Sequence, residues 1–196
     1  HLVLLDRAAG KSYELWQATP PSGQGGQTGW TATVATTLDT QGDGVSPRGD
    51  SVRATGLSLL LGLITYDEIQ AGGPIAHALA WAFDKPSSLY FTPPAVASDG
   101  KVNGGRATAI PAGARLQLDP ALDLDSLGLS PAGRRLAEAM QRYGLICVDT
   151  SGDSSVVAEA LSGERRWEGL LREDALHGIP IERLRVLRPS AKIPIP

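Results

Sequence analysis

The chain has 196 residues and a formal net charge of -3, with 18 basic and 21 acidic side chains interspersed. This length suffices for one large domain or two small ones that bury most of their apolar surface. Because no basic face is visible, we expect no nucleic-acid partner. The longest apolar run, residues 57–64, is too short to span a bilayer. The 23 glycines and 14 prolines favour many turns, and therefore many short strands.

Three strands are predicted in the first forty residues, at 1–6, 12–18 and 30–39. The first two are joined by a short segment with Gly10 in the turn, which is typical of a β-hairpin. The third is rich in Thr and Val, residues that favour strands. Side chains alternate along the second strand, so that Tyr13 faces away from Glu14 and Trp16.

Residues 54–83 form the most apolar stretch of the chain and contain His77, one of three histidines. The run 57–64, bounded by glycine and polar residues, predicts a buried strand or buried loop rather than a surface helix. Asp67 and Glu68 follow this run. We expect the remaining strands and loops to pack over the stretch.

One substantial helix is predicted at about 131–143. Ser130 is a suitable N-cap, Pro131 suits the first helical position, and Gly144 follows the helix end. Further strands are predicted at 88–96, 114–119, 145–149 and 183–187. Cys147, alone in an apolar segment, is expected to be a small buried side chain.

These elements predict a mainly β chain with a single domain over residues 1–188 and an extended tail at 189–196. Ten or so short strands with one helix suggest a two-sheet antiparallel sandwich, jelly-roll-like, with the helix packed on an end or face. The hairpin-type spacing of the strands argues against a parallel βαβ sheet.

The segments 56–83, 113–120 and 129–153 resemble a group of uncharacterised, mostly secreted bacterial proteins. The shared pattern has a strand starting with His, a Leu-Tyr-Glu segment, a Gly-Leu run ending in Tyr-Asp-Glu, a His-Ala-Leu strand and a helix ending in Tyr-Gly. The matching residues are His1, Tyr13, Glu14, Gly56, Leu57, Tyr66, Asp67, Glu68, His77, Ala78, Leu79, Arg115, Leu116, Tyr143 and Gly144. The resemblance implies a secreted bacterial protein with no established activity. In this pattern the His strand lies inside a longer protein, which favours interpreting His1 as a cleavage product. A separate hypothesis is that residues before His1 persist as an upstream fragment of the precursor and complete the sheet.

The candidate catalytic residues are Glu14, Asp67, Glu68 and His77. Two carboxylates on facing strands can divide acid and base work, as in glycoside cleavage, when their pKa values differ. Glu14 lies among aromatic residues on which a sugar ring stacks, which makes Tyr13 and Trp16 candidate ligand-binding residues. The alternative is structural: the two acids begin a one-turn helix, and His77 bonds the backbone within the core.

His1 suggests a different chemistry. A free N-terminal histidine supplies an amine and an imidazole, and His77 or His177 would complete a T-shaped copper site, as in lytic polysaccharide monooxygenases. The disulfides and the Gly and Pro that accompany such a terminus are missing here, and otherwise we expect no cofactor. Loop acids such as Asp39 and Asp43 could ligate calcium, but without EF-hand spacing we favour a solvated role. Arg48-Gly49-Asp50 matches the integrin-binding tripeptide, which occurs often by chance.

From the sequence we expect a secreted bacterial protein with a binding or structural role at a polysaccharide-rich surface. One alternative is a carbohydrate-cleaving enzyme that uses Glu14 with Asp67 or Glu68. The other is copper-dependent polysaccharide oxidation at His1. Whether the chain is an enzyme stays open at this point.

Overall fold

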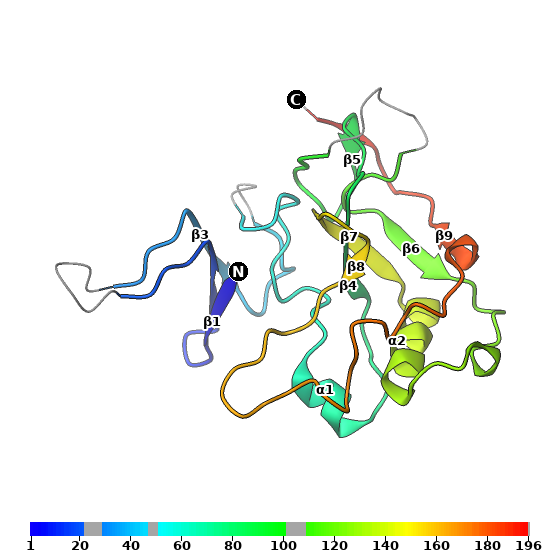
Figure 1. Cartoon of the computed structure of the whole chain (residues 1–196). Coiled ribbons are helices and arrows are strands. Elements are labelled where there is room, and N and C mark those ends of the chain that lie inside the picture. Colours follow the sequence, from blue (N-terminus) through cyan, green and yellow to red (C-terminus); the bar gives the residue numbers. More distant parts are fainter. Residues whose placement is uncertain (22–28, 47–50, 101–108, 196) are drawn as a thin grey trace.

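The computed structural model describes residues 1–21, 29–46, 51–100 and 109–195. Within these ranges the chain forms three β-sheets and two α-helices, of which one is substantial (Figure 1). The prediction of a mainly β chain with a single substantial helix is therefore confirmed. Antiparallel pairs occur in all three sheets, but the strand order does not confirm jelly-roll connectivity.

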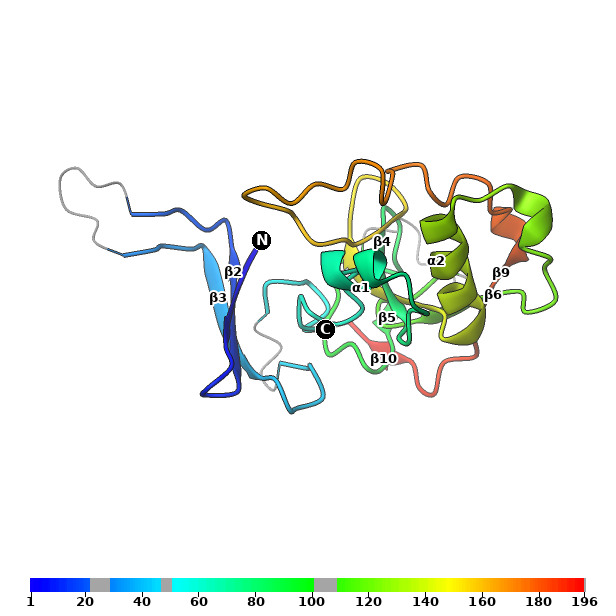
Figure 2. The ribbon, with the colours of Figure 1, turned by 90° about the horizontal axis from the view of Figure 1, so that it is seen from below.

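The first sheet is an antiparallel meander of β1 (Leu2–Asp6), β2 (Lys11–Trp16) and β3 (Val34–Asp39). Gly10 forms the β1–β2 turn with a φ of 63°, a conformation that glycine adopts without steric cost. The predicted hairpin is therefore confirmed. Figure 2 shows this N-terminal sheet standing beside the rest of the chain, which we call the body.

The N-terminal sheet turns a partly polar face toward the body. Alternation along β2 places Ser12 and Glu14 on this face, together with Leu38 of β3, and all three are buried. The opposite face carries Leu4 paired with Tyr13, and both side chains are exposed. The polarity of the two faces is thus the reverse of the usual arrangement.

The second sheet lies in the body and has the strand order β8-β4-β7-β6-β9. Its strands are β4 (Leu79–Phe83), β6 (Arg115–Leu118), β7 (Leu145–Thr150), β8 (Ser155–Val156) and β9 (Leu184–Val186). β4 and β7 run parallel, with Leu79 opposite Leu145, whereas the other neighbouring pairs are antiparallel. The argument against a parallel arrangement is wrong for this pair, because the long β4–β7 connection contains a helix and permits a crossover.

That helix, α2 (Pro131–Arg142), packs against β6 and fits the predicted bounds. The Ser130 hydroxyl caps it by accepting a hydrogen bond of 3.1 Å from the backbone N–H of Gly133. Leu136 and Met140 are buried in the main core, together with Cys147 of β7. Burial raises the pKa of the Cys147 thiol to about 12, so the prediction of a buried cysteine is confirmed.

Residues 57–64 form a buried loop, which is one of the two predicted alternatives. Leu57 and Ile64 are fully buried, and no strand includes them. The loop lies directly on β4 at Gly62, whose carbonyl accepts a hydrogen bond of 2.8 Å from the backbone N–H of Ala80. Gly62 has a φ of 70°, and a Cβ there would lie 2.4 Å from the Ala80 nitrogen. Only glycine fits this contact.

The remaining elements are short. A two-stranded antiparallel sheet joins β5 (Tyr90–Phe91) to β10 (Ile193–Pro194), so the extended tail is paired to the body. α1 (Tyr66–Ala71) follows the buried loop. Two 3-10 turns complete the list of elements, η1 (Asp125–Leu127) and η2 (Ile181–Arg183). Across the described residues, neither helix has the length and apolar character needed to cross a membrane.

Candidate functional site

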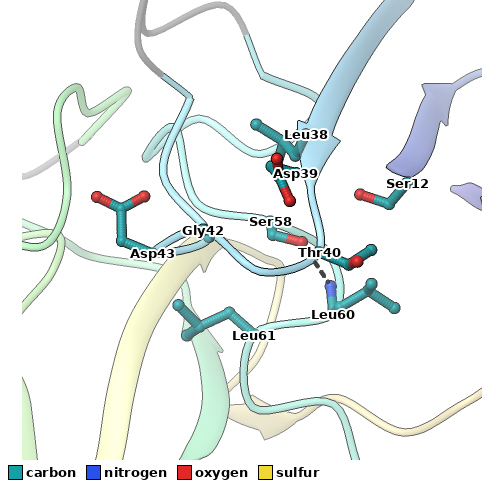
Figure 3. A pocket seen from close by; sticks show the side chains of 10 residues that line it. Ser12, Leu38, Asp39, Thr40, Gly42, Asp43, Ser58, Leu60 and Leu61 are labelled. Atoms are coloured by element: carbon teal, nitrogen blue, oxygen red, sulfur yellow. Dashed lines mark hydrogen bonds between the residues drawn. The ribbon is translucent and has the colours of Figure 1, made fainter. Parts of the chain in front are cut away.

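Glu14, the first predicted catalytic residue, is fully buried between the N-terminal sheet and the body. Its Oε2 accepts a hydrogen bond of 2.8 Å from the backbone N–H of Leu59, and its Oε1 accepts one from the Ser58 hydroxyl. The Ser58 hydroxyl in turn accepts a hydrogen bond of 3.1 Å from the backbone N–H of Leu60, drawn as a dashed line in Figure 3. Both carboxylate oxygens are therefore occupied by one loop of the body.

Arg53 holds the same loop through its carbonyl groups. It is only 2% exposed, and its guanidinium donates to the carbonyl oxygens of Ser58 at 2.6 Å and Leu59 at 3.3 Å. Burial lowers the pKa of Arg53 to about 10, while the charges of Asp149 and Glu14 act in the opposite direction. We call Glu14, residues 58–61 and Arg53 the buried clamp. The clamp attaches the N-terminal sheet to the body. Glu14 therefore has a structural role here.

Asp67 and Glu68 lie in the first turn of α1, as in the structural alternative. The Thr65 hydroxyl caps this turn by accepting a hydrogen bond from the backbone N–H of Glu68. Asp67 is exposed and faces Arg165, with 3.4 Å between Oδ1 and a guanidinium nitrogen. Figures 1 and 2 both show α1 apart from β2, which carries Glu14.

Glu68 and His77 are the two members of the predicted catalytic set that the structure brings into contact. Glu68 Oε2 lies 3.3 Å from His77 Nε2, and His77 Nδ1 lies 3.0 Å from the carbonyl oxygen of Ala78. A neutral imidazole carries one N–H group, so it donates either to the Ala78 carbonyl oxygen or to the Glu68 carboxylate. The pair is a carboxylate–imidazole contact without a further catalytic partner among its described hydrogen bonds.

The predicted ligand-binding aromatics lie on the N-terminal sheet. Tyr13 and Trp16 are 41% and 40% exposed, and the strand alternation directs them to opposite faces. His1, the proposed copper ligand, is exposed at the start of β1. Over the described residues, no three His, Cys, Asp or Glu side chains gather in a group that could hold a metal ion. Arg48-Gly49-Asp50 falls outside the described residues.

A hollow of about 230 Å³ lies beside the buried clamp, at the end of β3, and we call it the β3 hollow (Figure 3). Its lining residues come from the N-terminal sheet and from two loops: Ser12, Leu38, Asp39, Thr40, Gly42, Asp43, Gly44, Ser58, Leu60 and Leu61. In the view of Figure 3, Asp43 lies at the left and Ser12 at the right, with Asp39 and Ser58 between them. The hollow therefore collects carboxylate and hydroxyl oxygens above an apolar floor.

The two carboxylates of the β3 hollow are held in place by the backbone. Asp39 Oδ1 accepts a hydrogen bond of 2.9 Å from the backbone N–H of Gln41, and Oδ2 lies 3.3 Å from Lys11 Nζ. Both contacts lower the pKa of Asp39, the Gln41 hydrogen bond more than the lysine. Asp43 Oδ1 accepts a hydrogen bond of 3.0 Å from the backbone N–H of Val45. The sequence indicated these acids only as candidate calcium ligands. It did not predict the hollow, because the loop that completes the hollow lies far along the chain.

No family model, curated protein or solved structure matches this chain. The resemblance to a secreted bacterial group therefore stays a prediction, as do the two enzymatic alternatives. The function of this protein therefore has to follow from the geometry and chemistry of its site.

Proposed function

We propose that this protein binds a hydroxyl-rich ligand, a polysaccharide chain at a bacterial cell surface, and holds it in the β3 hollow without cleaving it. The observation that carries the proposal is the lining of the hollow, in which the oxygens of Asp39, Asp43 and Thr40 surround an open depression. In this proposal the protein is secreted, in line with the expectation from its sequence.

The chemistry of the hollow suits a sugar ring. Sugar hydroxyls donate hydrogen bonds to carboxylates, and such charge-assisted bonds are roughly twice as strong as those between neutral groups. Asp43 uses one oxygen for Val45, and its other oxygen makes no hydrogen bond among the described residues and can accept from a ligand. Leu60 and Leu61 provide an apolar floor for the C–H face of a ring. The volume of about 230 Å³ is below the usual range for drug-sized ligands, which suits one ring of a longer chain.

Asp39 and Glu14 suit binding better than cleavage. A glycosidase needs one carboxyl group that is protonated at working pH and acts as general acid. The pKa of Asp39 is lowered instead, so this group stays ionised and accepts hydrogen bonds. Glu14, the acid named in the hydrolytic alternative, has both oxygens occupied within the buried clamp.

Trp16 offers a second contact that is separate from the β3 hollow. Its ring is partly exposed, and a sugar ring can stack on it. Glu14 lies between Ser12 and Trp16 on the same strand face and is covered by the body, so the two contacts do not form one continuous groove. A long polymer can reach both contacts, whereas a free monosaccharide cannot.

The proposal is tested by sedimentation of the protein with insoluble cellulose, chitin and peptidoglycan. We expect retention on at least one polymer and about a tenfold weaker affinity for Asp39→Asn, which removes a charge but keeps the acceptor for Gln41. Asp84→Asn is the matched control, because Asp84 also pairs with a lysine, Lys85, at 3.1 Å. The proposal would be contradicted if the protein bound none of the three polymers, or if Asp39→Asn and Asp84→Asn lost equal affinity. Release of new reducing ends from a bound polymer would contradict its non-catalytic part.

A further inference from the structure

A larger cavity, of about 410 Å³, lies in the body and is independent of the β3 hollow. Its walls come from α2, from β8 and its flanks, and from the segment 167–177, so we call it the α2 cavity. The lining includes Leu136, Ser154, Trp167, Leu171 and Leu176. Its volume lies within the range of small-molecule sites in proteins.

The walls of the α2 cavity are fixed by contacts with the rest of the body. Trp167 donates a hydrogen bond of 3.0 Å from its indole nitrogen to the carbonyl oxygen of Glu159, and its ring packs on Tyr66 at 5.6 Å. The segment 167–177 also touches α2 directly, because a Cβ at Gly133 would lie 2.3 Å from the carbonyl oxygen of Ala175. The cavity is therefore preformed, which reduces the entropy lost on binding.

The chemistry of the lining defines the ligand. The inner walls are apolar, with Leu136 buried in the main core and Trp167, Leu171 and Leu176 packed against it. The Ser154 hydroxyl accepts a hydrogen bond of 2.8 Å from the Trp81 indole nitrogen. Its own hydrogen has no acceptor among the described residues, so it is free to donate to a ligand. Ser155 adds a second hydroxyl beside Ser154, and both serines are exposed, so the polar groups lie together at the edge of the apolar wall. A polar edge beside an apolar wall matches a mainly apolar molecule with an acceptor oxygen at one end.

The charged groups at the rim do not favour a charged ligand. Arg172 is neutralised by Asp174 through two hydrogen bonds of 2.8 and 2.9 Å. Glu173 and His177 are exposed at the rim and face solvent. Since the interior of the cavity carries no charge, a charged ligand would lose its hydration without gaining an ion pair.

We infer that the α2 cavity binds a small, neutral, mainly apolar molecule whose carbonyl oxygen accepts a hydrogen bond from Ser154. The apolar part packs against Trp167, Leu171 and Leu176. This ligand class is distinct from the hydroxyl-rich ligand of the β3 hollow, and neither site requires the other.

The inference is tested with 4-phenyl-2-butanone, a neutral aromatic ketone, followed by ¹H–¹⁵N NMR of the full chain. The four tryptophans give four indole signals, and those of Trp167 and Trp81 report on the cavity. We expect these two signals to shift saturably with a Kd of about 1 mM or tighter, while those of Trp16 and Trp30 stay in place. Absence of a saturable shift, or equal shifts of all four signals, would overturn the inference.

Two variants separate cavity binding from contact elsewhere. Leu176→Trp fills the cavity and should weaken binding at least tenfold, whereas Leu89→Trp adds the same ring at an exposed position and should change nothing. Ser154→Ala should weaken binding about fivefold, the value of one hydrogen bond. If Leu176→Trp does not fold, Ala158→Leu fills the same cavity. Undiminished binding in a folded filling variant would show that the ketone binds elsewhere.

Discussion

Replacement of Glu14 by alanine should strongly destabilise the protein, although the neighbouring side chains of β2 are exposed or half-buried. The change leaves the backbone N–H of Leu59 buried without its acceptor, which costs about 1–3 kcal/mol. It also removes the Ser58 hydrogen bond to the carboxylate and one of the two negative charges, with Asp149, whose attraction favours the charged form of the buried Arg53. These costs overlap, so we expect the free energy of unfolding to fall by about 2–4 kcal/mol.

Glu14→Gln should cost less, about 1–2 kcal/mol, because it keeps the shape of the side chain. Its amide oxygen can accept from Leu59, but its NH₂ group then faces the Ser58 hydroxyl, which must reorient. The measurement is urea unfolding at equilibrium, followed by circular dichroism and tryptophan fluorescence. Glu164→Ala, at an exposed position, is the control and should stay within about 0.5 kcal/mol of the parent protein.

A loss below about 1 kcal/mol for Glu14→Ala would refute the assignment of Glu14 to the buried clamp. Hydrogen exchange gives a local measure of the same contact. The amide of Leu59 should be well protected in the parent protein and lose protection in both Glu14 variants. Protection that persists in Glu14→Ala would show that another group holds the loop.

Three further predictions address the core, the buried loop and the loss of stability at acidic pH. The thiol of Cys147, with a pKa of about 12, should not react with iodoacetamide at pH 8 until urea unfolds the chain; fast reaction of the folded protein would contradict its burial. Gly62→Ala should lower the free energy of unfolding by at least about 2 kcal/mol, since its Cβ would collide with Ala80, while Gly152→Ala in open space should change little. The pKa of Asp119 is lowered, chiefly by a hydrogen bond from the backbone N–H two residues on and then by nearby arginines. Its folded pKa is below the unfolded value of 3.8, so its stabilisation is present above that pH and is lost as the pH falls through the folded pKa. Asp119→Asn should therefore flatten the acid limb of a stability profile measured by urea unfolding between pH 2 and pH 7, and an unchanged limb would contradict this.

Local signals in the sequence located most elements correctly. The β1–β2 hairpin follows from Gly10 in a short turn, and α2 follows from Ser130 and Pro131 at its start. Both depend on residues a few positions apart. The parallel pairing of β4 with β7 could not be predicted in this way, because the pairing is decided by packing between segments far apart in the chain. Hydrophobic periodicity gives the faces of a strand but not its neighbour.

The candidate site shows the same limit. Alternation along β2 correctly separated Tyr13 from Glu14, but it could not decide which of the two faces the body. That choice depends on Ser58, which lies 44 residues further along the chain and donates a hydrogen bond to Glu14. Arg53 was overlooked as well. A single cation immediately before a long apolar run is a signal that could have indicated a buried guanidinium held by backbone carbonyl oxygens.

The strand order of the second sheet has a consequence for synthesis of the chain. β7 lies between β4 and β6, and the outer strands β8 and β9 come later still in the sequence. Neither β4 nor β6 therefore has a partner from this sheet until residues beyond 144 are available. A nascent or truncated chain that stops before Leu145 can form the N-terminal meander, but its apolar strands in the body would stay unpaired and prone to aggregate.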